Sequence, residues 1–256
     1  MKNNNKFRLD VWGAITLGTI ALYALFLLYP MAYLIRQSVL DPDTGSFTLA
    51  YFTKFFSKSY YFDTLINSFK VSITATVLSI AIGTPLAYLF TIFKIKGKSV
   101  LNILIVVASM SAPFIGAYSW ILLLGRSGVI TTFFKNLGIA IPDIYGFGGI
   151  VLVMTLQLFP LVFLYAKGAL KNIDNSLIEA AENLGCSGIA CFFKVVVPLI
   201  MPTLLAAALL VFMRSFADFG TPMLIGEGYR TFPVVLYTEF INEVGGSDGF
   251  AAAIAV

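Results

Sequence analysis

The sequence predicts an all-α membrane protein with six transmembrane helices, the sixth of which is cut short by the end of the sequence. Hydrophobic residues make up 59% of the chain, and its mean hydropathy is +0.89. Charged residues make up 12% of the chain, which is about half of their usual share in a soluble domain. The apolar residues lie in long runs that polar segments separate, as expected for a chain that crosses the bilayer several times.

The first apolar run covers residues 11–35 and contains no charged residue. At about 1.5 Å per residue, it is long enough to cross a hydrocarbon core about 30 Å thick. It is too long for the apolar part of a typical signal peptide, and no small-residue cleavage site closes it. We therefore interpret it as the first transmembrane helix, with residues 1–10 as a cytoplasmic N-terminus.

Four further runs and the start of a sixth follow along the chain. We expect spans at residues 65–93, 99–124, 149–166 and 195–213, and an incomplete sixth helix at 249–256. Small residues and a proline at 109–113 predict a kink in the third span that suits close helix packing. We also expect a short amphipathic helix at 129–137 and a long loop at 214–248.

The residue types that are missing exclude several functions. The chain has no histidine, which removes the commonest general base and metal ligand. Its two cysteines, Cys186 and Cys191, lie in a loop that we expect to be cytoplasmic, where neither a disulfide nor a metal clip is expected. No Walker A pattern is present, so a P-loop ATP site is excluded. The net charge of +4 suits membrane orientation rather than nucleic-acid binding. We predict no catalytic residue, cofactor or metal site.

A polar island at residues 167–198 interrupts the apolar pattern. Ser176 and Glu179 have the spacing of a capping box, which predicts a short helix over residues 177–184. Gly185 would end this helix in the left-handed conformation, and Ser187 could cap a second helix that runs toward Pro198. We interpret the island as a compact helical hairpin.

The same island resembles the EAA loop of ABC importer permeases. The pattern is carried by Glu-Ala-Ala, a glycine, two spaced aliphatic residues and a proline, here Glu179, Ala180, Ala181, Gly185, Val195, Val197 and Pro198. Valine stands where that family usually has isoleucine and leucine. The resemblance implies a cytoplasmic coupling helix that docks on a separate ATP-hydrolysing subunit. An ordinary capped, amphipathic loop helix is the alternative interpretation.

The basic residues favour a cytoplasmic N-terminus. This topology places nine of the 17 lysines and arginines inside: Lys2, Lys6, Arg8, Lys94, Lys96, Lys98, Lys167, Lys171 and Lys194. The other eight lie in outer segments that have about twice as many loop residues, so the inner segments are denser in positive charge. The positive-inside rule therefore agrees with a cytoplasmic position of the EAA-like loop, in a bacterial plasma (inner) membrane.

Residues 214–240 resemble the segment before the last helix in permeases of the ferric-iron, polyamine and phosphonate importers, and the resemblance extends from about residue 65 onward. It implies a type I importer permease domain over residues 11–256. The implied partners are ATPase subunits, a second permease domain (a homodimer, a heterodimer or a fused second half), an external solute-binding protein and membrane lipid. The implied cargo is ferric iron or a similar small charged solute. Polyamine, 2-aminoethylphosphonate or another anion remains the alternative.

Three polar residues are candidates for the solute pathway or its gate. Arg214 and Asp218 are four residues apart, so we expect them to share a helix face, as an ion pair or as a polar lining of the gate. Gln157 lies inside the fourth span, where it would hydrogen-bond a neighbouring helix or face the pathway.

Two other classes of protein are less consistent with the sequence. A secondary transporter or channel would need a charged or glycine-broken helix at mid-membrane, and the predicted spans are nearly free of ionisable residues there. A membrane enzyme is disfavoured because histidine and paired intramembrane carboxylates are both missing.

Overall fold

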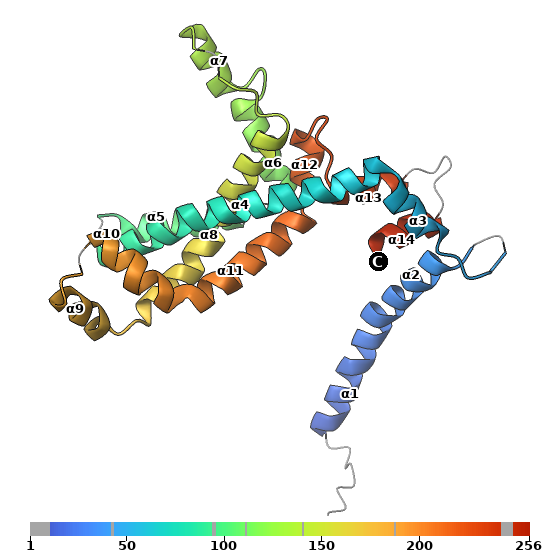
Figure 1. Cartoon of the computed structure of the whole chain (residues 1–256), viewed down its shortest axis with the longest axis horizontal. Coiled ribbons are helices and arrows are strands. Elements are labelled where there is room, and N and C mark those ends of the chain that lie inside the picture. The colour runs from blue at the N-terminus through green and yellow to red at the C-terminus, as the bar shows by residue number, and fades with distance from the viewer. Residues whose placement is uncertain are drawn as a thin grey trace, which may run out of the picture. The chain divides into compact units, whose positions relative to one another are not determined.

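The computed structural model describes residues 11–41, 44–93, 96–110, 112–139, 141–186, 188–241 and 248–256. Within these residues the chain is helical, and the only pairing of extended backbone is one bridge between Leu40 and Phe47 (Figure 1). The prediction of an all-α protein is confirmed. The chain divides into two compact units. The first is Met1–Phe62 with Leu236–Val256, and the second is Asp63–Val235.

The described residues contain five helices that are long and apolar enough to cross a membrane. They are Val11–Val39, Ser59–Ile92, Pro113–Asn136, Phe147–Lys171 and Gly188–Ala217. A shorter helix, α14 (Asp248–Ala255), begins where the sixth run was expected.

The first unit contains one long helix with no buried apolar face. It runs through α1 (Val11–Tyr23), a π-helical turn η1 (Ala24–Leu28) and α2 (Tyr29–Val39), and no residue of α1 or η1 is buried. Apolar side chains that the protein leaves uncovered are suited to contact lipid. At the other end of this unit, α14 packs against α2 and against α3 (Ala50–Ser57).

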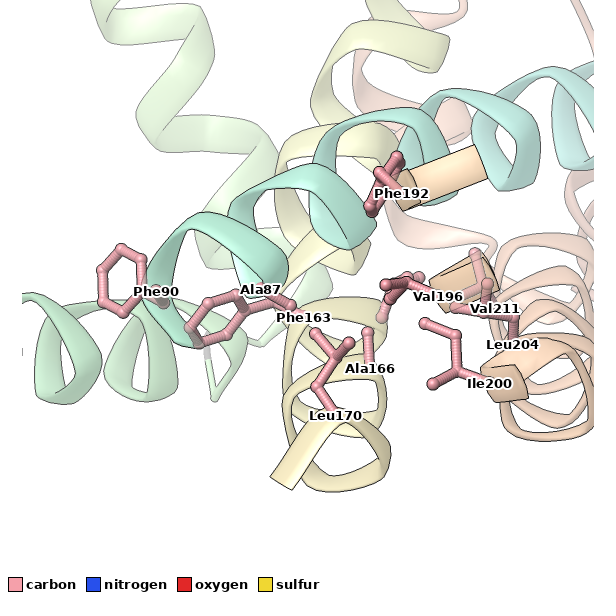
Figure 2. Close-up of a cluster of buried hydrophobic side chains, with 11 residues drawn as sticks. Ala87, Phe90, Phe163, Ala166, Leu170, Phe192, Val196, Ile200, Leu204 and Val211 are labelled. Carbon is pink, nitrogen blue, oxygen red and sulfur yellow. The ribbon is translucent and has the colours of Figure 1, made fainter. Parts of the chain in front are cut away.

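The second unit is built around α8 (Phe147–Lys171), which buries 11 of its residues. Figure 2 shows Phe163, Ala166 and Leu170 of α8 lying between α4 (Ser59–Ile92) and the helix that contains α11 (Val197–Ala217). The Phe90 ring of α4 meets the Phe163 ring edge-on, with centroids 5.1 Å apart. This three-helix core supports both candidate sites.

The expectation of one continuous third span at residues 99–124 is wrong. The structure has two helices there, α5 (Lys98–Ser109) and α6 (Pro113–Leu124). Pro113 has no backbone N–H and disfavours helical geometry in the residue before it, and Ala112 is extended with ψ 141°. The segment therefore breaks the helix where a kink was expected. The amphipathic helix expected at 129–137 is present as α7 (Val129–Asn136).

The expectation of a long loop at residues 214–248 is also wrong. Helix α11 continues to Ala217, and two further helices follow, α12 (Gly220–Ile225) and α13 (Phe232–Ile241). Helix α12 packs against α6 and α8. The apolar residues of α12 form a short helix here, because packing against α6 and α8 buries several of them.

Gly83 allows the backbones of α4 and α8 to approach closely. A Cβ atom at this position would lie 2.8 Å from the Phe159 carbonyl oxygen and 2.9 Å from the Val162 Cβ. Helices in a bilayer associate largely through such close packing of small residues. Gly168 in α8 is the opposite case, since a Cβ atom there would meet nothing within 4 Å.

We predict that Gly83→Ala lowers the thermal stability of the detergent-solubilised protein, because the new methyl group would push against the backbone of α8. Overpacking of this kind costs about 1–3 kcal/mol. The matched control is Gly168→Ala, which should leave the melting temperature unchanged or raise it, since alanine has the higher helix propensity. Equal melting temperatures for the two variants would contradict the close approach of α4 and α8.

Candidate functional site

The predicted helical hairpin is present as an elbow between α8 and α11. Helix α9 (Asn175–Asn183) is closed by a turn at Gly185, which has φ +85° as predicted, and α10 (Gly188–Cys191) follows. The backbone N–H groups of Leu184 and Cys186 donate to the Ala181 carbonyl at 3.2 Å and 3.0 Å. This arrangement closes the end of α9 and depends on the left-handed residue.

The N-terminus of α9 is capped by a different residue from the one that the expected capping box at Ser176 and Glu179 implied. Helix α9 begins at Asn175, and the Asp174 carboxylate accepts a hydrogen bond of 3.0 Å from the Ser176 backbone N–H. Aspartate is as good an N-cap as serine, so the cap lies two residues earlier than predicted. Its hydrogen bonds from Ser176 lower the pKa of the Asp174 carboxyl group. The expected cap at Ser187 lies outside the described residues.

The elbow exposes apolar side chains together with the predicted coupling residues. Glu179 and Ala180 are exposed, and Ala181 is half-buried. Leu184 and Ile189, on either side of Gly185, are 89% and 77% exposed. An apolar surface of this kind, bordered by polar residues, is typical of a site that contacts another protein.

The second arm of the elbow is continuous with the fifth span. One helix runs from Gly188 to Ala217 through α10, a π-helical turn η2 (Phe192–Val196) and α11. The span was expected to begin at residue 195, but Pro198 lies near the start of α11 without interrupting this helix. Phe192 is buried against Tyr88 of α4, with ring centroids 4.6 Å apart, so the elbow is anchored in the core.

The three candidate pathway residues line one pocket of about 480 Å³ in the second unit. Gln157 comes from α8, Arg214 from the last turn of α11, and Asp218 from the residue that follows α11. Residues of α5, α6, α8 and α11 and of the segment that leads into α12 complete the wall. The remaining lining residues are Ser109, Pro113, Phe114, Leu158, Ala217, Phe219 and Gly220.

Arg214 and Asp218 do not share a helix face, and the described residues contain no ion pair between them. Asp218 has left the helix, with ψ 120°. Its Oδ1 atom accepts hydrogen bonds from the backbone N–H groups of Gly220 at 2.9 Å and Thr221 at 3.3 Å, and its Oδ2 atom accepts one from the Thr221 hydroxyl at 2.6 Å. The Asp218 side chain therefore caps the first turn of α12 from the position before the N-cap residue Phe219.

Sequence reasoning missed a cluster around Arg126 in the second unit. The Arg126 guanidinium lies 3.1 Å from the Asp143 carboxylate and 2.7 Å from the Glu227 carboxylate, and 4.9 Å from the centre of the Tyr145 ring. It connects the loops around α7 to the turn after α12, where Glu227 has φ +51°. The glycines on both sides of Glu227 were the available signal for this tight turn.

The arrangement of the described helices is the fold of the permease subunits of ABC importers. It is similar to the crystal structure of a bacterial ABC transporter involved in the import of the acidic polysaccharide alginate, with a TM-score of 0.72 and 17% identity over 96% of this chain and 88% of that chain. A second structure, of the bacterial alginate ABC transporter with an alginate pentasaccharide-bound periplasmic protein, gives a TM-score of 0.75 and 16% identity over 96% and 87%.

The chain belongs to the family described as binding-protein-dependent transport system inner membrane component, which matches residues 46–256. Members of this family are multi-pass membrane permeases of ABC importers and not enzymes.

Curated relatives from Haemophilus influenzae carry two kinds of name. The putative ferric transport system permease protein FbpB 1 is 28% identical over 85% of this chain and 34% of its own length. The spermidine/putrescine transport system permease protein PotB is also 28% identical, over 99% of this chain and 90% of its own length. The chain thus spans about a third of the ferric permease and nearly all of the polyamine permease.

We predict that Asp218→Ala destabilises the second unit by about 0.5–2 kcal/mol, the usual cost of losing an N-cap. Asp218→Asn should retain most of the stability, because the amide oxygen can still accept the hydrogen bonds from the Gly220 and Thr221 backbone. Thermal unfolding in detergent would measure both variants. An equal loss in the two variants would contradict a capping role for Asp218.

Proposed function

We propose that this chain is the transmembrane permease subunit of an ATP-driven ABC importer. It forms part of a solute pathway, and it couples uptake of a small charged solute to ATP hydrolysis on a separate subunit. The observation that carries this proposal is the continuous helix Gly188–Ala217, which begins at the exposed elbow and ends with Arg214 in the wall of the pocket. Movement of the elbow would therefore move a residue that lines the pathway.

The elbow has the features that a coupling site needs. Ala180 and Ala181 are small, so a partner surface can approach α9 closely, and Glu179 adds an exposed charge beside them. Leu184 and Ile189 supply apolar contact area. The buried side chains of Phe192 and Val196 tie the second arm to the core, so that force on the elbow reaches α11 instead of bending a loop.

The family supports an assembly with four kinds of partner. We infer ATPase subunits on the elbow, a second permease domain beside the pathway, an external solute-binding protein, and the surrounding lipid. One structurally similar transporter was solved with its periplasmic protein, which supports the external partner. In this topology residues 1–10 and the coupling loop 167–198 are cytoplasmic, and residues 11–256 form the permease domain in the inner membrane.

The preferred cargo is ferric iron, with polyamine as the second candidate. Ferric permeases share 28% identity with this chain, but the chain covers only 34% of their length. The polyamine permease of Haemophilus influenzae has the same identity and is covered over 90% of its length. The greater coverage is the observation that favours the polyamine alternative.

We predict that Glu179→Lys and Gly185→Pro reduce co-purification of the ATPase subunit and lower solute-stimulated ATP hydrolysis. Glu179→Lys reverses a charge at the proposed interface, and Gly185→Pro is incompatible with φ +85°. Asn136→Lys, on the exposed face of α7, is the control and should change neither measurement. The coupling assignment would fail if all three variants retained the ATPase equally.

A second experiment tests the cargo. The complete importer, with its neighbouring ATPase, permease and binding-protein genes, would be reconstituted in proteoliposomes and supplied with labelled iron(III) citrate or spermidine. We expect ATP-dependent accumulation of iron. If only spermidine accumulated, polyamine would become the assigned cargo in place of ferric iron. If either solute still accumulated without the ATPase subunits, the proposed function would be refuted.

A further inference from the structure

The pocket of Gln157, Arg214 and Asp218 presents hydrogen-bond donors that are not in use. The Gln157 Nε2 atom is buried and has no hydrogen-bond partner among the described residues. Arg214 lies on the exposed side of α11, and the described residues include no carboxylate that pairs with it. Buried donors are normally satisfied. Gln157 and Arg214 line the same pocket, so a ligand that supplies acceptors would pair with the guanidinium and, once the amide turns toward it, with Gln157.

The one carboxylate in the wall does not supply those acceptors. Both oxygens of Asp218 already accept hydrogen bonds, from the Gly220 and Thr221 backbone and from the Thr221 hydroxyl. These donors lie at the start of α12, where a negative charge is also favoured by the helix dipole. These hydrogen bonds use three acceptor sites of Asp218 within its own turn and leave its charge in the wall. The hydrogen-bond donors of the pocket are therefore those of Arg214 and Gln157.

The rest of the wall would strengthen an interaction with an anion. Phe114 and Phe219 meet edge-on with centroids 5.2 Å apart, and Leu158 and Pro113 add further apolar surface. Electrostatic attraction is stronger beside apolar walls than in bulk water. A guanidinium can bind a carboxylate or phosphate through two parallel hydrogen bonds, and a volume of about 480 Å³ lies in the range of small-molecule sites.

From these observations we propose that the pocket recognises its solute through oxyanions, by way of Arg214 and Gln157. The class of ligand is a small carboxylate, phosphate or phosphonate, or a ferric ion that such groups enclose. This inference rests on the proposed permease function and narrows its cargo. A polyamine carries only positive charge and ammonium donors, so Arg214 would repel it and Gln157 Nε2 would gain no acceptor. Asp218 is the one described lining residue that would attract it, and its oxygens already accept hydrogen bonds within their own turn.

Charge selectivity can be measured with a cysteine in the wall of the pocket. Ala217 is small and exposed and lines the pocket, so Ala217→Cys would place a thiol there without removing either donor. The chain would carry Cys186→Ser and Cys191→Ala and would be assembled with its partner subunits in lipid nanodiscs. The thiol would be labelled in separate reactions with two methanethiosulfonates, an anionic sulfonatoethyl reagent and a cationic trimethylammonium-ethyl reagent. Each labelling rate would be divided by the rate of the same reagent with a small free thiol in solution.

We expect the anionic reagent to react at least about threefold faster than the cationic one. The Arg214 charge has no ion-pair partner among the described residues, whereas the Asp218 charge is stabilised by three hydrogen bonds at the start of α12. Arg214→Gln should abolish this preference and Arg214→Lys should retain it. Thr132→Cys, on the exposed side of α7, is the reference position, where Arg214→Gln should have no effect. The inference would be overturned if the cationic reagent reacted faster, or if the ratio of the anionic to the cationic labelling rate were the same with and without Arg214→Gln.

Protection from labelling identifies the ligand class directly. Iron(III) citrate, 2-aminoethylphosphonate and spermidine would each be added before the reagent. The oxyanion site is supported if iron(III) citrate or 2-aminoethylphosphonate slows the labelling of Ala217→Cys, and if this protection disappears in the Arg214→Gln background. A comparison of the two probes distinguishes an enclosed ferric ion from a free anion. Protection by spermidine alone, or by no probe, overturns it. The labelling rates and the protection do not depend on ATP coupling. If they contradicted the oxyanion site while Glu179→Lys still lowered solute-stimulated ATP hydrolysis, the oxyanion inference would fail and the permease proposal would stand.

Discussion

Lipid tails are as apolar as leucine side chains, so helices in a bilayer gain little from hydrophobic burial and must fit closely to remain together. In the second unit this constraint falls on α8, which packs against α4 at Gly83 and against the helix Gly188–Ala217, with Ala166 and Val196 in the shared core. The contact determines where Gln157 lies relative to Arg214. It also determines how firmly the elbow is attached to the core, so both candidate sites depend on one layer of packing.

Much of the fold followed from patterns that are local in the sequence. Uncharged runs identified most of the spans, because no other segment could cross the bilayer. The left-handed conformation of Gly185 was predicted since few other residues adopt it. The grouping of Gln157, Arg214 and Asp218 in one wall was only partly foreseeable. Each residue stood out as a polar group near an apolar run, but their proximity depends on the packing of α8 against α11.

The predictions from sequence that proved wrong share a physical origin. A residue can be suited to two local roles, and its contacts in the folded protein determine which role it takes. Asp218 is spaced for an ion pair with Arg214, but it instead caps α12, which is held in place by α6 and α8. Asp174 and Ser176 are both good caps, and the structure uses the earlier one. Pro113 ends a helix that its apolar neighbours would have continued. Tertiary contacts determine which of the two roles is taken, and these contacts cannot be read from a single sequence.

The π-helical turn at Phe192–Val196 has a geometric effect on the helix that contains it. Such a turn accommodates one extra residue within an α-helix, and one residue corresponds to a rotation of about 100°. The side chains of α10 are therefore out of phase with those of α11 by that angle. Removing one residue from this turn would realign the two stretches, and it would redirect Ile189 around the helix axis while leaving the composition of the elbow intact.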